Sequence, residues 1–143
     1  MFIDASALVA IIAGESDGET LARQLDAAEE RYTAPISMYE TTLALLRVRR
    51  TNFVAVSGLL GGFVTRSHIQ IVPITAEIGG LAIDAFERFG RGRHPAALNM
   101  GDCFAYACAR SLGVPLLFKG EDFAKTDIRV ARAPRPPGRG RGN

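Results

Sequence analysis

Four acidic residues, far apart in the chain, each stand where a strand of a parallel sheet would pass into a helix or loop. They are Asp4, Glu40, Asp102 and Asp122. In open α/β sheets, ligands bind beyond the carboxyl ends of the strands, so acids delivered to that edge would share one cleft. Two carboxylates about 4 Å apart repel by roughly 4 kcal/mol at an effective dielectric near 20. Hard cations such as Mg²⁺ or Mn²⁺ prefer oxygen ligands and relieve that repulsion, so the four acids predict a metal site.

Each acid also has a purely structural interpretation. Asp4 can cap the helix that follows it, and Asp122 can stabilise a turn. Glu40 in SMYE and Asp102 in NMGD each stand three residues after a capping-type residue and can close a capping box. These interpretations would have to hold for all four acids at one sheet edge, so the shared site is favoured.

Alternating strands and helices must position the acids. The apolar runs and turn residues predict strands over Met1–Ile3, Tyr32–Ala34, Ile69–Ile74 and Pro115–Phe118, and a short edge strand over Ile128–Ala131. The helical periodicity predicts helices over Ser6–Ala13, Gly18–Glu30, Ser37–Arg50, Asn52–Arg66, Thr75–Phe89 and Gly101–Leu112. This alternation is typical of an α/β fold with a parallel sheet and right-handed crossovers.

Composition and charge separate a domain from a tail. With 143 residues and 48% hydrophobic content, the chain can form one domain, placed at residues 1–131. Residues 132–143, RAPRPPGRGRGN, are rich in Arg, Pro and Gly and are expected to be disordered. The five basic residues from Arg129 onward leave 12 basic against 15 acidic residues in residues 1–128. The tail can therefore contact phosphates or an acidic partner, or be a solvated terminus.

Membrane association is not expected. The apolar runs are too short to span a bilayer, and no secretory signal opens the chain, which predicts a cytoplasmic protein.

The same residues resemble the motifs of PIN-domain ribonucleases, specifically VapC toxins of type II toxin–antitoxin pairs. The first motif, a hydrophobic pair before Asp-x-Ser-Ala, is matched by residues 2–7, and the second, a Glu early in a helix, by Glu40. Residues 101–107 match the third, Gly-Asp-Cys-x-Ala-Tyr-Ala, and residues 122–127 match Asp-Phe trailed by Thr-Asp. Some relatives carry the last acid where this chain has Gly120, which leaves Asp122 as the candidate and Glu121 as a helper. The resemblance covers residues 1 to about 130.

This resemblance implies a PIN-like three-layer α/β/α fold with a mainly parallel sheet of four to five strands. It also implies a metal-dependent endoribonuclease in which Asp4 and Asp102 are the main ligands of Mg²⁺ or Mn²⁺. Glu40 and Asp122 would act through water or hold a second ion, and Ser6 would orient Asp4 or a bound water.

The partners implied by the resemblance are RNA, commonly a transfer RNA, and a VapB-like antitoxin that covers the active site of a homodimer. Basic residues around the acids would form the rim that a polyanion requires, and they include Arg47, Arg91, Arg93 and Lys119. The main alternative is a non-catalytic PIN-like module that binds nucleic acid or protein. A phosphate-handling receiver or phosphatase-like enzyme is disfavoured because no second acid stands beside Asp4.

Overall fold

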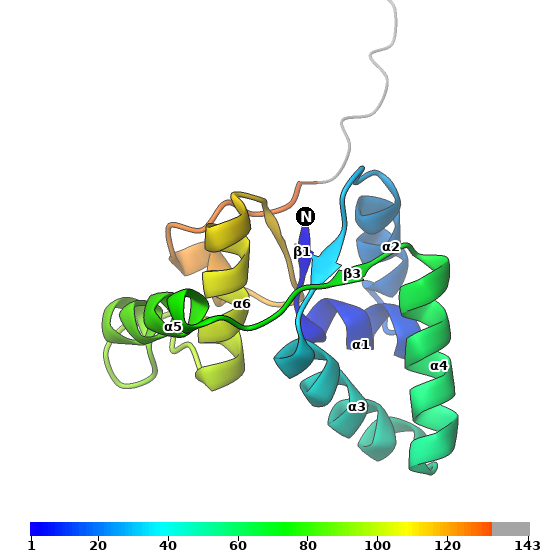
Figure 1. Ribbon diagram of the computed structural model, residues 1–143. Coiled ribbons are helices and arrows are strands. Elements are labelled where there is room, and N and C mark those ends of the chain that lie inside the picture. The colour runs from blue at the N-terminus through cyan, green and yellow to red at the C-terminus, as the bar shows by residue number, and fades with distance from the viewer. Residues whose placement is uncertain (133–143) are drawn as a thin grey trace, which may run out of the picture.

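Four short strands form a central sheet with helices on both faces in the computed structural model, which describes residues 1–132 (Figure 1). The strands are β1 (Phe2–Ile3), β2 (Tyr32–Thr33), β3 (Gln70–Ile71) and β4 (Leu116–Leu117). The helices are α1 (Ala5–Ala13), α2 (Gly18–Asp26), α3 (Pro35–Arg49), α4 (Phe53–Arg66), α5 (Ala76–Phe89) and α6 (Met100–Leu112), followed by the 3₁₀ turn η1 (Phe123–Lys125). Apart from its first residue, the predicted tail lies outside the described residues.

All strand pairs are parallel, in the order β3-β2-β1-β4. Phe2 of β1 pairs with Tyr32 on one side and with Leu116 on the other. The order reverses between β1 and β4, and such a switch point is where α/β sheets bind ligands. Asp4 lies directly beyond this switch point. Its N–H donates to the carbonyl of Leu117 at 3.0 Å and adds one hydrogen bond to the pairing of β1 with β4.

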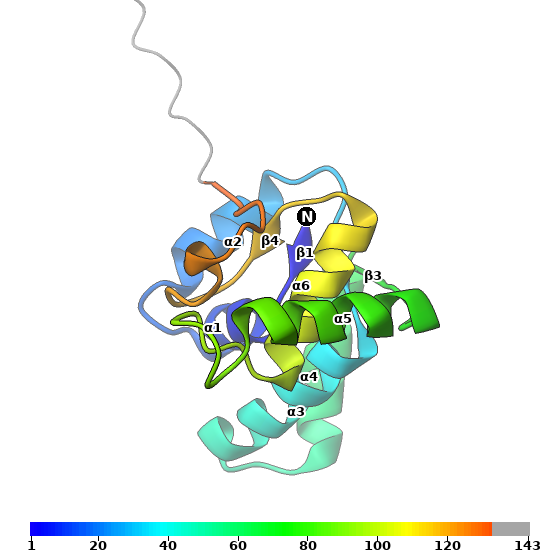
Figure 2. The same cartoon turned by 90° about the vertical axis from the view of Figure 1, so that its left-hand side faces the viewer.

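The alternation of side chains along the strands builds a core on each face of the sheet. Phe2 and Leu116 pack into one core with residues of α5 and α6. Ile3 and Leu117 point to the opposite face and pack with residues of α1, α2 and α4. Figure 1 shows α5 and α6 together on one side of the strands, and in Figure 2 this side faces the viewer. The predicted three-layer α/β/α fold is confirmed.

Several element boundaries differ from the prediction. The third strand was predicted over Ile69–Ile74 but covers Gln70–Ile71. The last hydrogen bond that joins it to β2 is donated by the N–H of Val72, and Pro73 has no N–H to continue the pairing. The edge strand predicted over Ile128–Ala131 is reduced to one isolated bridge between Leu116 and Val130.

The helix predicted over Gly18–Glu30 ends at Asp26. The chain beyond it is held by Arg31, which donates to the carbonyls of Asp26, Ala28 and Ser67. None of the helices within residues 1–132 has the length and apolar character needed to cross a bilayer.

Candidate functional site

Three helices that carry acids begin at one end of the sheet. α1 follows β1 through Asp4, α3 begins at Pro35 after β2, and α6 begins at Met100. In Figures 1 and 2 these helix starts lie below the sheet, around the end of β1. Glu40 lies in the second turn of α3 and Asp102 in the first turn of α6. The fold therefore brings acids from three separate segments to the predicted edge.

Asp4 is the most deeply buried of these acids, with 4% of its surface exposed. Its Oδ2 accepts the N–H of Ser6 at 3.0 Å and the hydroxyl of Ser6 at 2.5 Å. The same hydroxyl accepts the N–H of Lys119, beyond β4, at 3.0 Å. Because Ser6 accepts from Lys119, it directs its own proton to Asp4. The expected orienting contact from Ser6 is present, and Asp4 also caps α1.

The capping box considered for Glu40 is wrong. α3 begins at Pro35 with Ala34 as its N-cap, so Ser37 lies inside the helix and cannot cap it. Proline is favoured at the first helical position because its fixed φ suits a helix start. Glu40 is half-buried, and its carboxylate lies against Gly101 at the start of α6. No role for Gly101 was expected from the sequence, although a glycine inside a helix is unfavourable and can mark a close approach.

The capping box considered for Asp102 is confirmed. The Oδ1 of Asn99 accepts the N–H of Asp102 at 2.9 Å, and the Oδ2 of Asp102 accepts the N–H of Asn99 at 3.0 Å. Within residues 1–132, no hydrogen bond from the protein reaches the second oxygen of Asp102. The cap therefore fixes the direction of this carboxylate and leaves one oxygen for a ligand.

Asp122 is exposed, whereas the three inner acids, Asp4, Glu40 and Asp102, are buried or half-buried. Its side chain makes no cap bond to η1, and only its carbonyl closes the turn, by accepting the N–H of Lys125. Its charge contributes to the raised pKa of Asp102, which places the two carboxylates within electrostatic reach of each other.

Burial raises the pKa of all three inner acids, and repulsion from neighbouring acids adds to the effect for Glu40 and Asp102. Burial raises the pKa of Asp4 against the hydrogen bonds from Ser6. Burial, followed by the charges of Asp4 and Asp102, raises the pKa of Glu40 to about 7. Burial also raises the pKa of Asp102 to about 6, with Asp4 and Asp122 adding to the effect. In the described part of the chain, none of the three inner acids forms an ion pair.

This donor set fits a hard cation. The side chains present only carboxylate and hydroxyl oxygens, which Mg²⁺ and Mn²⁺ prefer, and both free cysteines are buried in the core. Among residues 1–132, no three His, Cys, Asp or Glu side chains form a ready-made metal cage. Mg²⁺ keeps several waters and takes one or two carboxylates directly, so a site without a full protein cage suits it.

A groove of about 560 Å³ opens beside the inner acids. Its lining combines apolar side chains of α1 and α3 with charged ones, namely Ala5, Ser6, Val9, Glu15, Glu40, Leu43, Ala44, Arg47 and Lys119. Lys119 forms ion pairs with Glu15 and, at 3.5 Å, with Asp17. Lys119 is therefore less available to a phosphate than the sequence predicts.

The basic loop before α6 is held together by a backbone bridge and a side-chain hydrogen bond. A parallel bridge joins Gly90 to Leu98, and His94 Nδ1 accepts the N–H of Ala96 at 3.0 Å. His94 therefore supports the loop, as an ordinary loop histidine does. Arg91 of this loop is exposed, and its charge acts on Asp102 by lowering the pKa of that acid. Among the basic residues of this loop, Arg91 is the one whose charge acts on Asp102.

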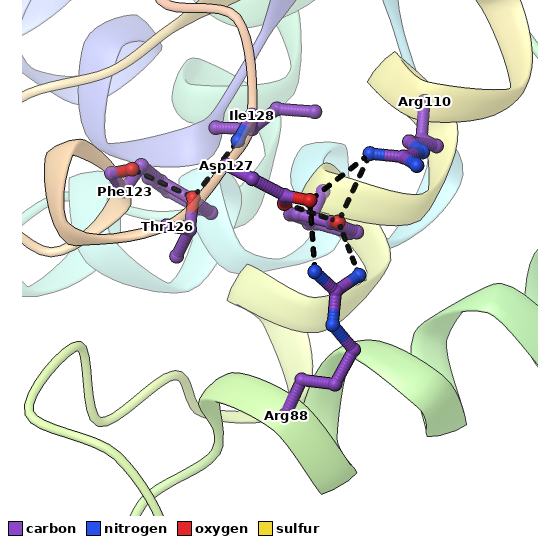
Figure 3. A network of polar contacts seen from close by, with 7 residues as sticks. Arg88, Arg110, Phe123, Thr126, Asp127 and Ile128 are labelled. Carbon is purple, nitrogen blue, oxygen red and sulfur yellow. Dashed lines mark hydrogen bonds and ion pairs between the residues drawn. The ribbon is translucent and has the colours of Figure 1, made fainter.

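Two residues of the motifs quoted above serve the fold instead of the site (Figure 3). Tyr106 of α6 donates its hydroxyl to Asp127 at 2.7 Å. Asp127 also accepts from Arg88 of α5 at 2.8 Å and from Arg110 of α6 at 3.4 Å. The hydrogen bond from Tyr106 and the charge of Arg88 lower the pKa of Asp127 to about 2. This network ties the segment after η1 to both helices of one layer.

Comparison with known proteins places the chain in a family. Residues 1–129 match the PIN domain family. The chain is 38% identical over 135 residues to ribonuclease VapC30 of Mycobacterium tuberculosis, covering 94% of this chain and 100% of that protein. It is 40% identical over 129 residues to ribonuclease VapC of Mycolicibacterium smegmatis, covering 90% and 97%.

A solved structure agrees with the fold. The crystal structure of Mycobacterium tuberculosis VapC20, described as a sarcin-ricin loop cleaving toxin, matches with a TM-score of 0.72 at 20% identity. The match covers 93% of this chain and 98% of that chain. The parallel sheet, the acids at its switch point and the identity to curated relatives agree, and the chain belongs to the PIN domain family, among the VapC ribonucleases.

Proposed function

We propose that this VapC ribonuclease is the toxin of a type II toxin–antitoxin pair and hydrolyses RNA with the help of Mg²⁺ or Mn²⁺. The observation that carries the proposal is the group of Asp4, Glu40 and Asp102 at the switch point of the sheet. Their pKa values are raised, and no protein cation pairs with them within residues 1–132. A non-catalytic module has no need to keep such repulsion in its binding site.

The role proposed for each acid follows from its contacts and its burial. Asp4, fixed by Ser6, and Asp102, fixed by its cap, would hold the cation. When bound, Mg²⁺ or Mn²⁺ supplies a more acidic water and neutralises charge on the phosphate. Glu40, with a pKa of about 7, is suited to take a proton from the attacking water at neutral pH. Asp122 would act through water or on a second ion.

The proposed substrate is a transfer RNA that is cut at one site, and this cut would stop translation. The proposed location of the protein is the cytoplasm. The basic loop supports contact with RNA, since Arg91 is exposed and its charge reaches Asp102. The sarcin-ricin loop, named for the solved relative, is the second RNA to test.

The proposed inhibitor is a VapB-like antitoxin segment lying in the groove beside the acids. The groove offers apolar Val9 and Leu43 next to acidic Glu40, which forms no ion pair within residues 1–132, and this suits a peptide with apolar and basic side chains. An antitoxin that bound with equal affinity after Leu43→Glu would contradict this placement.

We also propose that the protein is a homodimer. An apolar groove of about 670 Å³ lies between α5 and α6. Ile83 and Met100 line it and are 71% and 69% exposed, which is unusual for large apolar side chains grouped together. In sedimentation experiments the wild type is expected to show twice the 15.4 kDa chain mass, and Ile83→Asp to shift it to the monomer. A monomeric wild type at micromolar concentration would contradict the dimer.

The ribonuclease proposal is tested with the purified protein and a labelled tRNA pool. With Mg²⁺ or Mn²⁺ we expect discrete cleavage products, and chelation by EDTA should reduce the rate at least about 100-fold, because the acids then lack their cation. Activity should return when the metal is added back. Equal cleavage with and without EDTA would contradict metal dependence. Binding of RNA without cleavage under every metal condition would favour the non-catalytic alternative.

A further inference from the structure

Gly101 has an unusual place at the start of α6. It is buried, and it directly precedes Asp102 in the first turn of the helix. A Cβ atom built on Gly101 would meet three atoms of one side chain, the two carboxylate oxygens and Cδ of Glu40, all below the 3.0 Å limit of real Cβ contacts. The carboxylate of Glu40 therefore occupies the space that an alanine methyl would fill.

The need for glycine here is one of space and not of backbone conformation. The described glycines with positive φ are Gly14, Gly92, Gly113 and Gly120, so the backbone of Gly101 is one that alanine adopts readily. Glycine also disfavours a helix relative to alanine. The helix would therefore gain from alanine at this position if Glu40 were absent.

We infer that Gly101 is a positioning residue, whose missing side chain lets the Glu40 carboxylate reach the acid cluster with Asp4 and Asp102. This inference rests on the proposed function, in which Glu40 takes part in RNA cleavage. The three nearest atoms to the added methyl belong to the flexible end of Glu40, and none belongs to the backbone of another element. Rotation of Glu40 away from the cluster is the easiest relief, so Gly101→Ala should displace Glu40 and leave the fold intact.

The test is a cycle of four proteins: wild type, Gly101→Ala, Glu40→Ala and the double variant. Gly101→Ala is expected to lower kcat for RNA cleavage about 100-fold with little change in KM, as expected when a general acid–base group is lost. In the Glu40→Ala background, the same change should cause no further loss. The matched control is Gly58→Ala in α4, because a Cβ there meets nothing within 4 Å, and its activity should equal that of wild type.

Melting temperature provides a readout independent of activity and metal. In the Glu40→Ala background, Gly101→Ala should raise the Tm by about 2–4 °C, the gain in helix propensity. In the wild-type background that gain should be smaller, because Glu40 must move. A crystal structure of Gly101→Ala should show the Glu40 carboxylate turned away from Asp102.

The possible failures are distinguishable. If Glu40→Ala keeps full activity, the role proposed for Glu40 is wrong. If Glu40→Ala is inactive but Gly101→Ala cleaves RNA at the wild-type rate, the inference about Gly101 is overturned. Loss of more than about 10 °C in Tm for both Gly101→Ala and the double variant would also overturn it, because the backbone and not Glu40 would then meet the methyl.

Discussion

Asp4→Asn is expected to reduce RNA cleavage by about 10³-fold or more, which corresponds to roughly 4 kcal/mol in transition-state stabilisation. The change removes the buried charge that would hold the cation, while asparagine keeps the shape and can still cap α1. The protein should be at least as stable as wild type, because burial penalises the charged form of Asp4. Cleavage rates with Mn²⁺ and a thermal melt of the metal-free protein measure the two effects.

The matched control is Asp127→Asn, the same chemical change in another motif acid. Here the expected results are reversed. Cleavage remains near the wild-type rate, and stability falls because the ion pair of Asp127 with Arg88 is lost. The loss is only about 1 kcal/mol, because the side chain of Asp127 is partly exposed. The pKa of Asp127 is lowered in the folded state to about 2. Its stabilising effect is therefore present near neutral pH and is lost as the pH falls from about 4 to about 2.

The pair of variants separates catalysis from folding. If Asp4→Asn cleaved RNA as fast as the wild type, Asp4 would have no part in the reaction. If Asp127→Asn lost activity as severely as Asp4→Asn while remaining folded, the assignment of Asp127 to the structural network would be wrong.

The metal-free protein is expected to become more stable as the pH falls from about 7 towards 4.5. The pKa of Glu40 is raised from 4.5 to about 7 in the folded state, so the folded protein binds this proton more tightly than the unfolded chain. Asp4, Asp102, Asp122 and Arg91 are the charged groups that act on the cluster. The pKa of Asp102, raised to about 6, shifts stability in the same direction. Followed in the opposite direction, this stabilisation is lost as the pH rises from about 4.5 through 7.

Added Mn²⁺ should counteract this dependence. Above pH 7 the acids are ionised and bind the cation, so saturating Mn²⁺ at 100 times its Kd should stabilise the protein by about 2.7 kcal/mol. Near pH 4.5 the protonated acids bind it weakly, and the effect should nearly vanish. Melting curves between pH 4.5 and 8, with and without Mn²⁺, test this, and Glu40→Gln is the control that should flatten the metal-free curve. A metal-free protein that gained stability from pH 4.5 to 7 would contradict the account.

Local patterns predicted most of the fold because each strand ends at a clear signal. Apolar runs stopped by Asp4 and Pro35, and the alternation of strand and helix, were sufficient for a parallel α/β sheet. The start of α3 was misplaced because Ser37 is a common capping residue, whereas Pro35 fixes the true start. Strand lengths were overestimated because ladder bonds depend on the neighbouring strand, which one sequence segment does not specify.

The sequence predicted the acids of the candidate site but not the contacts that other residues make with them. Asp4 is identified by its charge and its position directly after β1, and Asp102 by its charge and its position at the start of a helix. The contact of Gly101 with Glu40 joins residues 61 positions apart in the sequence, and the ion pairs of Lys119 depend on the turn between α1 and α2. Such contacts arise from packing, and no local pattern specifies them.

Anomalous diffraction from crystals soaked in Mn²⁺ shows whether Asp4 and Asp102 share one cation. We expect a single strong anomalous peak in contact with carboxylate oxygens of both Asp4 and Asp102, and its loss in Asp102→Asn crystals. A saturating soak with no peak at these two side chains, in crystals of protein that still cleaves RNA, would contradict a shared cation.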